Sequence, residues 1–136
     1  MRPILATISH DALRHNLGVV RRHAPNSKVM AVVKANGYGH GLLNVAPGLA
    51  DADGFAVLNI GEGMDLREVG YKHTILLLEG VFSATELALA CSFSLDIVVH
   101  SLPQLEMLEA VTLPKPVNVH LKMNTGMQVN ILKMVS

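Results

Sequence analysis

The sequence predicts an α/β fold built around a parallel sheet. Short apolar runs rich in Val, Ile and Leu recur at nearly regular intervals along the 136 residues. Uninterrupted apolar runs are typical of strands that are buried on both faces, as the strands of parallel sheets are. The stretches between the runs have a helical pattern, and each is long enough for the short helix that a crossover between parallel strands requires. About five βα units are therefore expected.

The apolar runs also give the positions of the strands. They are expected at residues 29–33, 54–58, 74–78, 95–99 and 117–121. A helix is expected before the first strand, at residues 11–23. Leu13, Leu17 and Val20 would give this helix one apolar stripe.

Three of the later helices have recognisable start signals. In a capping box, a hydroxyl or amide side chain and a carboxylate or amide three residues later satisfy the free backbone amides at a helix start. The pairs that fit are Ser83 with Glu86, Ser101 with Gln104 and, in a looser version, Asn59 with Glu62.

Composition excludes two classes of partner. Eleven basic and eleven acidic residues give a formal net charge of +0, which leaves no basic surface for nucleic acid or an anionic membrane. No apolar run approaches the length of a membrane span and no secretory signal follows Met1, so the cytoplasm is the expected compartment. Cys91 is the single cysteine and is expected to be a buried helix thiol. The histidine spacings predict no metal site.

The most informative segment follows the first expected strand. An apolar run ends there at Lys34 and continues into the glycine-rich segment 35–41, which contains Tyr38 and His40. A lysine that is desolvated at the mouth of a parallel strand can lose its proton and attack an aldehyde. The glycines would let backbone amides approach a phosphate. Pyridoxal phosphate carries both groups.

Parallel strands would bring several distant residues to one edge of the sheet. The residues just after the carboxyl ends of the five expected strands are Lys34, Asn59, Glu79, His100 and Lys122. This edge holds the ligands in (β/α) barrels and in open doubly wound sheets alike. Lys34 and Lys122 are therefore candidates for one site in either architecture.

The segment from Lys34 to Gly41 closely resembles the cofactor-binding motif of the alanine racemase family, in which a lysine followed by Ala-Asn, a tyrosine and Gly-His-Gly anchors pyridoxal phosphate. Three further segments resemble the family in its order along the chain: residues 8–16, 76–80 and 122–127. The resemblance implies a (β/α)8 TIM-type barrel, of which this chain would form about five of the eight strands. It also implies that Lys34 is catalytic and binds the cofactor, and that Tyr38 donates to its phosphate.

Lys122 has a counterpart in the same family. The lysine of the corresponding segment can be carbamylated there, and it then positions an arginine against the cofactor. The resemblance makes Lys122 the candidate for this modification. Val129 stands where the family has that arginine, however, and this departure argues against carbamylation of Lys122.

The resemblance implies an isomerase that interconverts L-alanine and D-alanine for the supply of cell-wall precursors. Racemisation needs an acid/base group on each face of the substrate. In the family the second group is a tyrosine of a C-terminal β domain, acting across a homodimer interface. We expect residues 1–127 to be the barrel portion, residues 128–136 an atypical tail, and the C-terminal β domain to be absent.

Such a chain is expected to be inactive alone and to associate with itself through unpaired strand edges. Two other interpretations remain open. The chain could be a non-catalytic fragment that binds pyridoxal phosphate without turnover, or a small carrier or regulator that binds this cofactor.

Overall fold

The computed structural model describes residues 4–123 and 125–126. It contains one sheet of five parallel strands, in the order β1-β2-β3-β4-β5. The strands are β1 (Met30–Val32), β2 (Gly54–Val57), β3 (Thr74–Leu77), β4 (Asp96–Val99) and β5 (Val119–Leu121). Each lies within the range that the apolar runs predict. The tail predicted at residues 128–136 lies outside the described residues.

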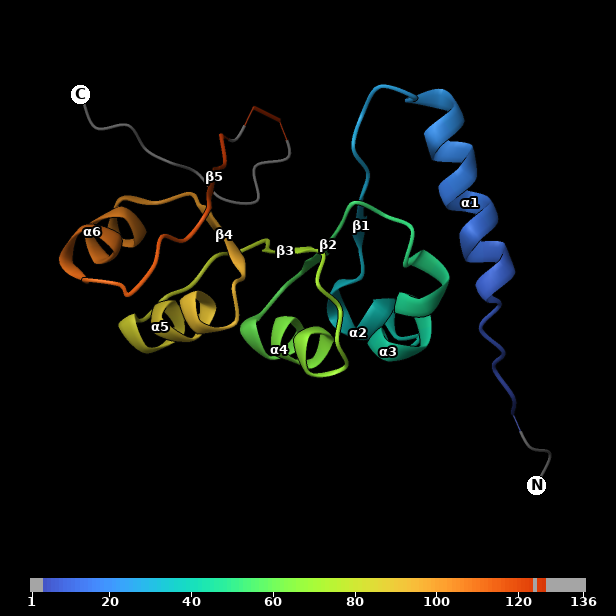
Figure 1. The fold of residues 1–136 in the computed structure, drawn as a ribbon, viewed down its shortest axis with the longest axis horizontal. Coiled ribbons are helices and arrows are strands. Elements are labelled where there is room, and N and C mark those ends of the chain that lie inside the picture. Colours follow the sequence, from blue (N-terminus) through green and yellow to red (C-terminus); the bar gives the residue numbers. More distant parts are fainter. Residues whose placement is uncertain (1–3, 124, 127–136) are drawn as a thin grey trace.

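The strand order distinguishes between the two architectures that the sequence left open. A doubly wound sheet reverses its strand order at a switch point and carries helices on both faces. Here the order follows the chain without reversal, and the helices between the strands follow one side of the curved sheet (Figure 1). The structure is thus an arc of a (β/α) barrel, as predicted.

The helices connect successive strands. Three of them follow β2, β3 and β4: α4 (Ile60–Glu68), α5 (Ala84–Ser92) and α6 (Leu102–Ala110). Helix α1 (His10–His23) precedes β1 and confirms the predicted first helix. The connection from β1 to β2 is divided into short pieces: α2 (Lys34–Tyr38), α3 (Leu42–Val45) and a 3-10 turn, η1 (Ala46–Leu49).

The predicted capping pairs are confirmed in part. Asn59 Oδ1 accepts from the amide of Glu62 at 3.0 Å, and Ser83 Oγ accepts from the amide of Glu86 at 3.1 Å. The prediction for Ser101 is wrong, because its hydroxyl does not cap the helix. It lies 3.3 Å from the side-chain oxygen of Gln104 instead.

The main core lies between the sheet and its helices. Phe55, Ile75 and Leu77 from the strands are fully buried there against Leu66 and Leu87 from the helices. Burying side chains of this size contributes about 1.5–3 kcal/mol each. This layer therefore holds the five βα units together.

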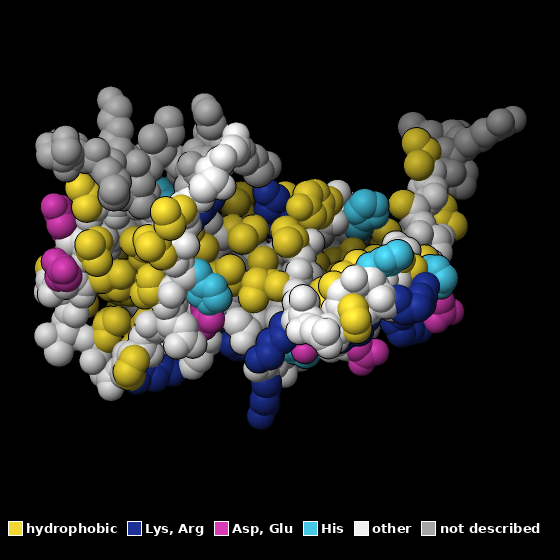
Figure 2. All heavy atoms as spheres, turned by 90° about the horizontal axis from the view of Figure 1, so that it is seen from above, with side chains coloured by type: hydrophobic (Ala, Val, Ile, Leu, Met, Phe, Trp, Pro, Cys, Tyr) yellow, Lys and Arg dark blue, Asp and Glu magenta, His cyan; other side chains and the backbone are white. Residues whose placement is uncertain are grey.

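The opposite face of the sheet is the inner wall of the arc. A smaller apolar cluster of Ala56, Leu76 and Val98 lies on it, flanked by Met30 and Leu78. Apolar side chains gather across the middle of this face in Figure 2, which looks at the sheet from the side away from the helices. Within the described residues, β1 and β5 each pair on one side only, so the arc is open at both edges.

Two further sequence predictions can be compared with the structure. Cys91 is buried in α5, as expected, and its Sγ lies 3.4 Å from the carbonyl oxygen of Lys115. Among the described residues, no helix has both the length and the apolar character of a membrane span.

Candidate active site

Lys34 lies at the carboxyl edge of the sheet. Residue 33 still continues the sheet pairing, because the amide of Val33 donates to the carbonyl oxygen of Ala56 at 2.9 Å. The chain then leaves the sheet, and Lys34 begins α2. Lys34 is partly buried, and its amine makes no hydrogen bond or ion pair with other described residues. The structure thus places at the barrel mouth a lysine whose amine has no hydrogen-bond or ion-pair partner among the described residues.

The segment that follows Lys34 turns in the left-handed sense. The φ angles of Ala35, Asn36, Gly37 and Tyr38 are 53°, 53°, 63° and 54°. Left-handed conformation costs roughly 1–2 kcal/mol for each residue other than glycine. Three such residues in succession around one glycine make α2 a strained turn, which persists only where other contacts hold it. The sequence predicted a glycine-rich turn here but not this run of positive φ angles.

Hydrogen bonds to Asn36 hold the turn at both of its ends. The backbone oxygen of Asn36 accepts from the amide of Gly41 at 2.8 Å, and its side-chain oxygen accepts from the amide of Leu42 at 2.8 Å. The backbone amide of Asn36 donates to Oε1 of Glu62, also at 2.8 Å. The turn is therefore tied to the start of α3 on one side and to α4 on the other.

Gly37 is required by packing as well as by conformation. It is buried, and a Cβ atom placed on it would lie 2.9 Å from Cγ2 of Val45. The glycine therefore lets the turn pack directly on α3. By contrast, a Cβ atom on Gly39, whose φ is 84°, would meet no atom within 4 Å.

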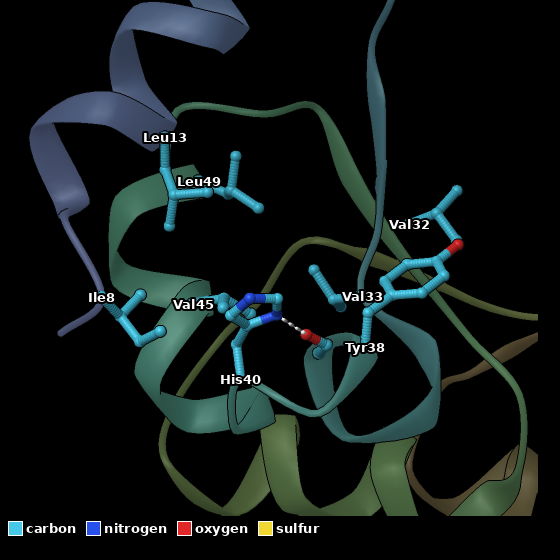
Figure 3. A pocket seen from close by; sticks show the side chains of 9 residues that line it. Ile8, Leu13, Val32, Val33, Tyr38, His40, Val45 and Leu49 are labelled. Carbon is cyan, nitrogen blue, oxygen red and sulfur yellow. Dashed lines mark hydrogen bonds between the residues drawn. The ribbon is translucent and has the colours of Figure 1, made fainter. Parts of the chain in front are cut away.

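Tyr38 and His40 point in different directions. The ring of Tyr38 lies beside Val32 and is 58% exposed, whereas His40 turns inward toward the carbonyl of Gly37 (Figure 3). The Nδ1 atom of His40 lies 3.0 Å from that carbonyl oxygen. His40 thus braces the loop, and the phenol of Tyr38 remains accessible to a ligand at the mouth.

Both residues line an apolar pocket beside the first strand. Its other walls come from α1, α3 and β1 and include Leu13, Val33 and Val45 (Figure 3). This pocket adjoins the loop on the side of the unpaired edge of β1.

Lys122 lies at the same edge of the sheet as Lys34 but at the other end of the arc. Its amide donates to the carbonyl oxygen of Val99 at 2.9 Å, which fixes its backbone just beyond β5. Four strand spacings of about 4.8 Å separate β1 from β5, or about 19 Å along the sheet. The two lysines therefore share one rim, four strand spacings apart along the curved sheet. Val129 lies outside the described residues.

The other three rim residues are engaged in holding the rim together. Asn59 caps α4. The carbonyl oxygen of Glu79 lies 3.2 Å from Nε2 of His100 and accepts from Nε2 of Gln104 at 2.9 Å. His100 and Gln104 are both buried. Glu79 is held through its backbone carbonyl oxygen, so the side chains of Lys34, Glu79 and Lys122 are the ones at this rim that make no hydrogen bond or ion pair with described residues.

Sequence reasoning did not identify Glu62 as part of this site. The residue was recognised as a helix-start signal, and that role is correct in part. Its bond to Asn36 joins two segments that are 26 residues apart, so no local pattern could predict it.

Comparisons with known sequences agree on one family. The family model for the alanine racemase N-terminal domain matches residues 8–130. An alanine racemase of Burkholderia mallei (strain SAVP1) is 56% identical over 126 residues, which are 93% of this chain and 35% of the relative. An alanine racemase of Shewanella loihica is 56% identical over 122 residues, which are 90% of this chain and 34% of the relative.

Solved structures lead to the same family. The biosynthetic alanine racemase from Pseudomonas aeruginosa superposes with a TM-score of 0.88 at 46% identity, over 94% of this chain and 36% of that chain. The alanine racemase from Corynebacterium glutamicum gives a TM-score of 0.82 at 31% identity, over 93% of this chain and 37% of that chain. The chain spans about a third of the length of its curated relatives. By sequence and by fold, it belongs to the alanine racemase family, to the N-terminal domain.

Proposed function

We propose that this chain binds pyridoxal phosphate through Lys34 and takes part in the interconversion of L-alanine and D-alanine. The observation that carries the proposal is the position of Lys34, directly after β1 at the barrel mouth, with an amine that no described residue engages. An uncommitted amine at this edge can bind an aldehyde covalently. The names of the relatives supply the reaction.

The donors at the mouth fit the two ends of this cofactor. Lys34 offers an amine for the aldehyde, and Tyr38 offers an exposed phenol that can donate to a phosphate. When bound, pyridoxal phosphate acts as an electron sink that acidifies the α-proton of an amino acid. Lys34 Nζ would then move a proton to or from one face of the substrate α-carbon.

Racemisation also needs an acid/base group on the other face of the substrate. The sequence contains two tyrosines, Tyr38 and Tyr71. Tyr71 precedes β3 and therefore lies toward the opposite edge of the sheet from Lys34, where its ring packs 5.3 Å from that of Phe55. Burial also raises the pKa of Tyr71, which lowers the fraction of its hydroxyl that is ionised and able to accept a proton near neutral pH. We therefore propose that the 136-residue chain binds the cofactor but does not racemise alanine by itself.

Three further parts of the proposal concern the surroundings of the site. Lys122 is proposed to remain an uncarbamylated cation at the rim, because Val129 takes the place of the partner arginine. The chain is proposed to act in the cytoplasm and to serve the supply of D-alanine for the cell wall. We also propose that it associates with itself through the edges of β1 and β5, in place of the homodimer expected of the family.

The test combines cofactor uptake with mapping of the modified lysine. The purified chain is titrated with pyridoxal phosphate, its visible absorbance is followed, and the product is reduced with borohydride and mapped by mass spectrometry. We expect modification at Lys34, loss of the absorbance in Lys34→Ala, and no change in Lys72→Ala, which removes an exposed lysine before β3. Label scattered over several lysines would refute a formed site. Measurable racemisation by the chain would refute the proposed lack of turnover.

A further inference from the structure

We propose that Glu62 is a positioning residue for Lys34. Its carboxylate joins the connection after β1 to the connection after β2 and holds the strained turn on which Lys34 is presented. The inference rests on the proposed function for the role of Lys34. We call the two hydrogen bonds that the Glu62 carboxylate accepts, from the amides of Asn36 and Leu58, the clamp. These contacts are independent of the proposed function.

The carboxylate of Glu62 uses its two oxygens for two different connections. Oε1 accepts from the amide of Asn36 at 2.8 Å, and Oε2 accepts from the amide of Leu58 at 2.9 Å. The backbone amide of Glu62 is itself held by Asn59 Oδ1 at 3.0 Å. Hydrogen bonds to an ionised carboxylate are roughly twice as strong as neutral ones. Glu62 is also partly buried, which reduces competition from water.

The amide that Glu62 holds lies inside the left-handed turn. Ala35 and Asn36 both have φ of 53°, so this part of the turn opposes the ordinary preference of the chain. Without an acceptor on the Asn36 amide, the turn would relax toward negative φ. Relaxation would rotate the backbone next to Lys34 and change the direction in which Lys34 and Tyr38 leave the loop.

Two other residues of the same barrel can be compared with Glu62. Glu86 and Gln104 occupy the same third position of α5 and α6. Each accepts from the amide just before its own helix: Glu86 from Phe82 at 2.8 Å, and Gln104 from His100 at 2.9 Å. A single acceptor oxygen is sufficient for that bond, as the amide of Gln104 shows. Gln104 reaches the preceding connection by donating from Nε2 to the carbonyl oxygens of Glu79 and Val81, whereas Glu62 reaches it by accepting through a second oxygen.

The chain therefore offers a matched pair of substitutions. In Glu62→Gln one oxygen remains as an acceptor, while the other becomes an NH2 group that cannot accept from an amide. Glu86→Gln makes the same chemical change in α5, where one acceptor is enough. Thermal melts of both full-length variants establish that each is folded. Glu62→Asp, one methylene shorter, replaces Glu62→Gln if the latter does not fold.

The first measurement is hydrogen exchange of the Asn36 amide without cofactor. We expect exchange at least about tenfold faster in Glu62→Gln, since a bond to a charged group is lost, and unchanged exchange in Glu86→Gln. The second measurement is the dissociation constant for pyridoxal phosphate together with the fraction of borohydride label on Lys34. We expect the constant to rise about tenfold in Glu62→Gln alone.

Each result decides the inference. Wild-type exchange at Asn36 in Glu62→Gln would overturn the clamp. Faster exchange with unchanged cofactor affinity would overturn its role in positioning Lys34. Equal effects of the two variants on affinity would reduce Glu62 to a helix cap and overturn the proposal. If the wild-type chain took up no pyridoxal phosphate at Lys34, the proposed function would fail and positioning of Lys34 for it would fail as well, whereas the exchange data would still show whether the clamp exists.

Discussion

At the scale of single residues, the site depends on which side chains have no hydrogen-bond or ion-pair partner among the described residues. His40 and His100 are both near the barrel mouth, but each has a ring nitrogen beside a backbone carbonyl oxygen. Lys34 and Tyr38 make no such bonds with the described residues. A group that is already bonded must break that bond before it binds a ligand. Lys34 and Tyr38 are therefore the better placed of these four for a cofactor.

The role of Tyr38 gives a prediction at this scale. Tyr38→Phe removes one hydroxyl donor and keeps the ring that lies beside Val32. A hydrogen bond to a charged phosphate contributes about 1.5–3 kcal/mol, so the dissociation constant for pyridoxal phosphate should rise at least about tenfold. Equilibrium titration by absorbance measures it. Tyr71→Phe is the control, and an unchanged constant in Tyr38→Phe would remove Tyr38 from the phosphate site.

At the scale of elements, side chains add contacts between segments at the amino-terminal edge of the sheet. Asp53 precedes β2 and accepts from the amide of Val29, which precedes β1, at 2.7 Å. It also pairs with Arg21 of α1 at 3.3 Å. Arg67 of α4 donates to the carbonyl oxygens of four residues: Tyr71, His73, Phe93 and Ser94. These contacts hold helices to the amino-terminal edge of the sheet, opposite the site.

Asp53 gives a prediction about pH at the element scale. The hydrogen bond from the Val29 amide, together with Arg21 and Lys28, lowers the pKa of Asp53 in the folded chain. A lowered pKa adds stability above the pH at which a free aspartate titrates, about pH 4, and that stability is lost as the pH falls through the lowered value. Asp53→Asn should therefore be less stable than wild type at pH 7. The difference should shrink as the pH falls below about 4.

Urea unfolding at a series of pH values measures this difference. Asp51→Asn is the matched control, because Asp51 is exposed and its bond to Arg21 uses the backbone oxygen. Asp51→Asn keeps the backbone bond to Arg21 and should therefore change stability at pH 7 less than Asp53→Asn does. A gap for Asp53→Asn that did not change with pH would contradict the assigned ion pair and hydrogen bond.

At the scale of the whole molecule, the dominant feature is the open arc. In a closed barrel every strand has two neighbours and the inner face is filled by side chains. Here β1 and β5 have one neighbour each among the described residues, and Val32, Val119 and Leu121 are exposed on them. Unpaired strand edges with apolar side chains are templates for pairing with another chain.

We therefore expect the chain to form oligomers. Light scattering coupled to size exclusion should give a mass above 14.6 kDa that rises with concentration. Val119→Lys should reduce this association, because a lysine on an edge strand opposes pairing. Val69→Lys, a change of the same kind at the end of α4, should not. A wild-type chain that stayed monomeric at all concentrations would refute the prediction.

The sequence predicted the five strands, the first helix and the lysine at the barrel mouth. These depend on local patterns, namely continuous apolar runs and the run of special residues after Lys34. The sequence-based predictions were wrong where a side chain had more than one partner within reach. Ser101 was expected to cap α6, but its hydroxyl lies beside the side-chain oxygen of Gln104, which also accepts from His100.

The order of residues along this chain was sufficient to determine the family, the βα repeat and the amine at the end of β1, because each of these is encoded within a few neighbouring positions. Tertiary structure alone decided three other features. They are the left-handed course of residues 35–38, the bond from Glu62 to Asn36, and the separation of Lys34 from Lys122 along the rim. The second and third are relations between segments that are distant in the chain, and the first is held by one of them, the bond from Asn36 to Glu62. Such relations are determined only when the segments pack together.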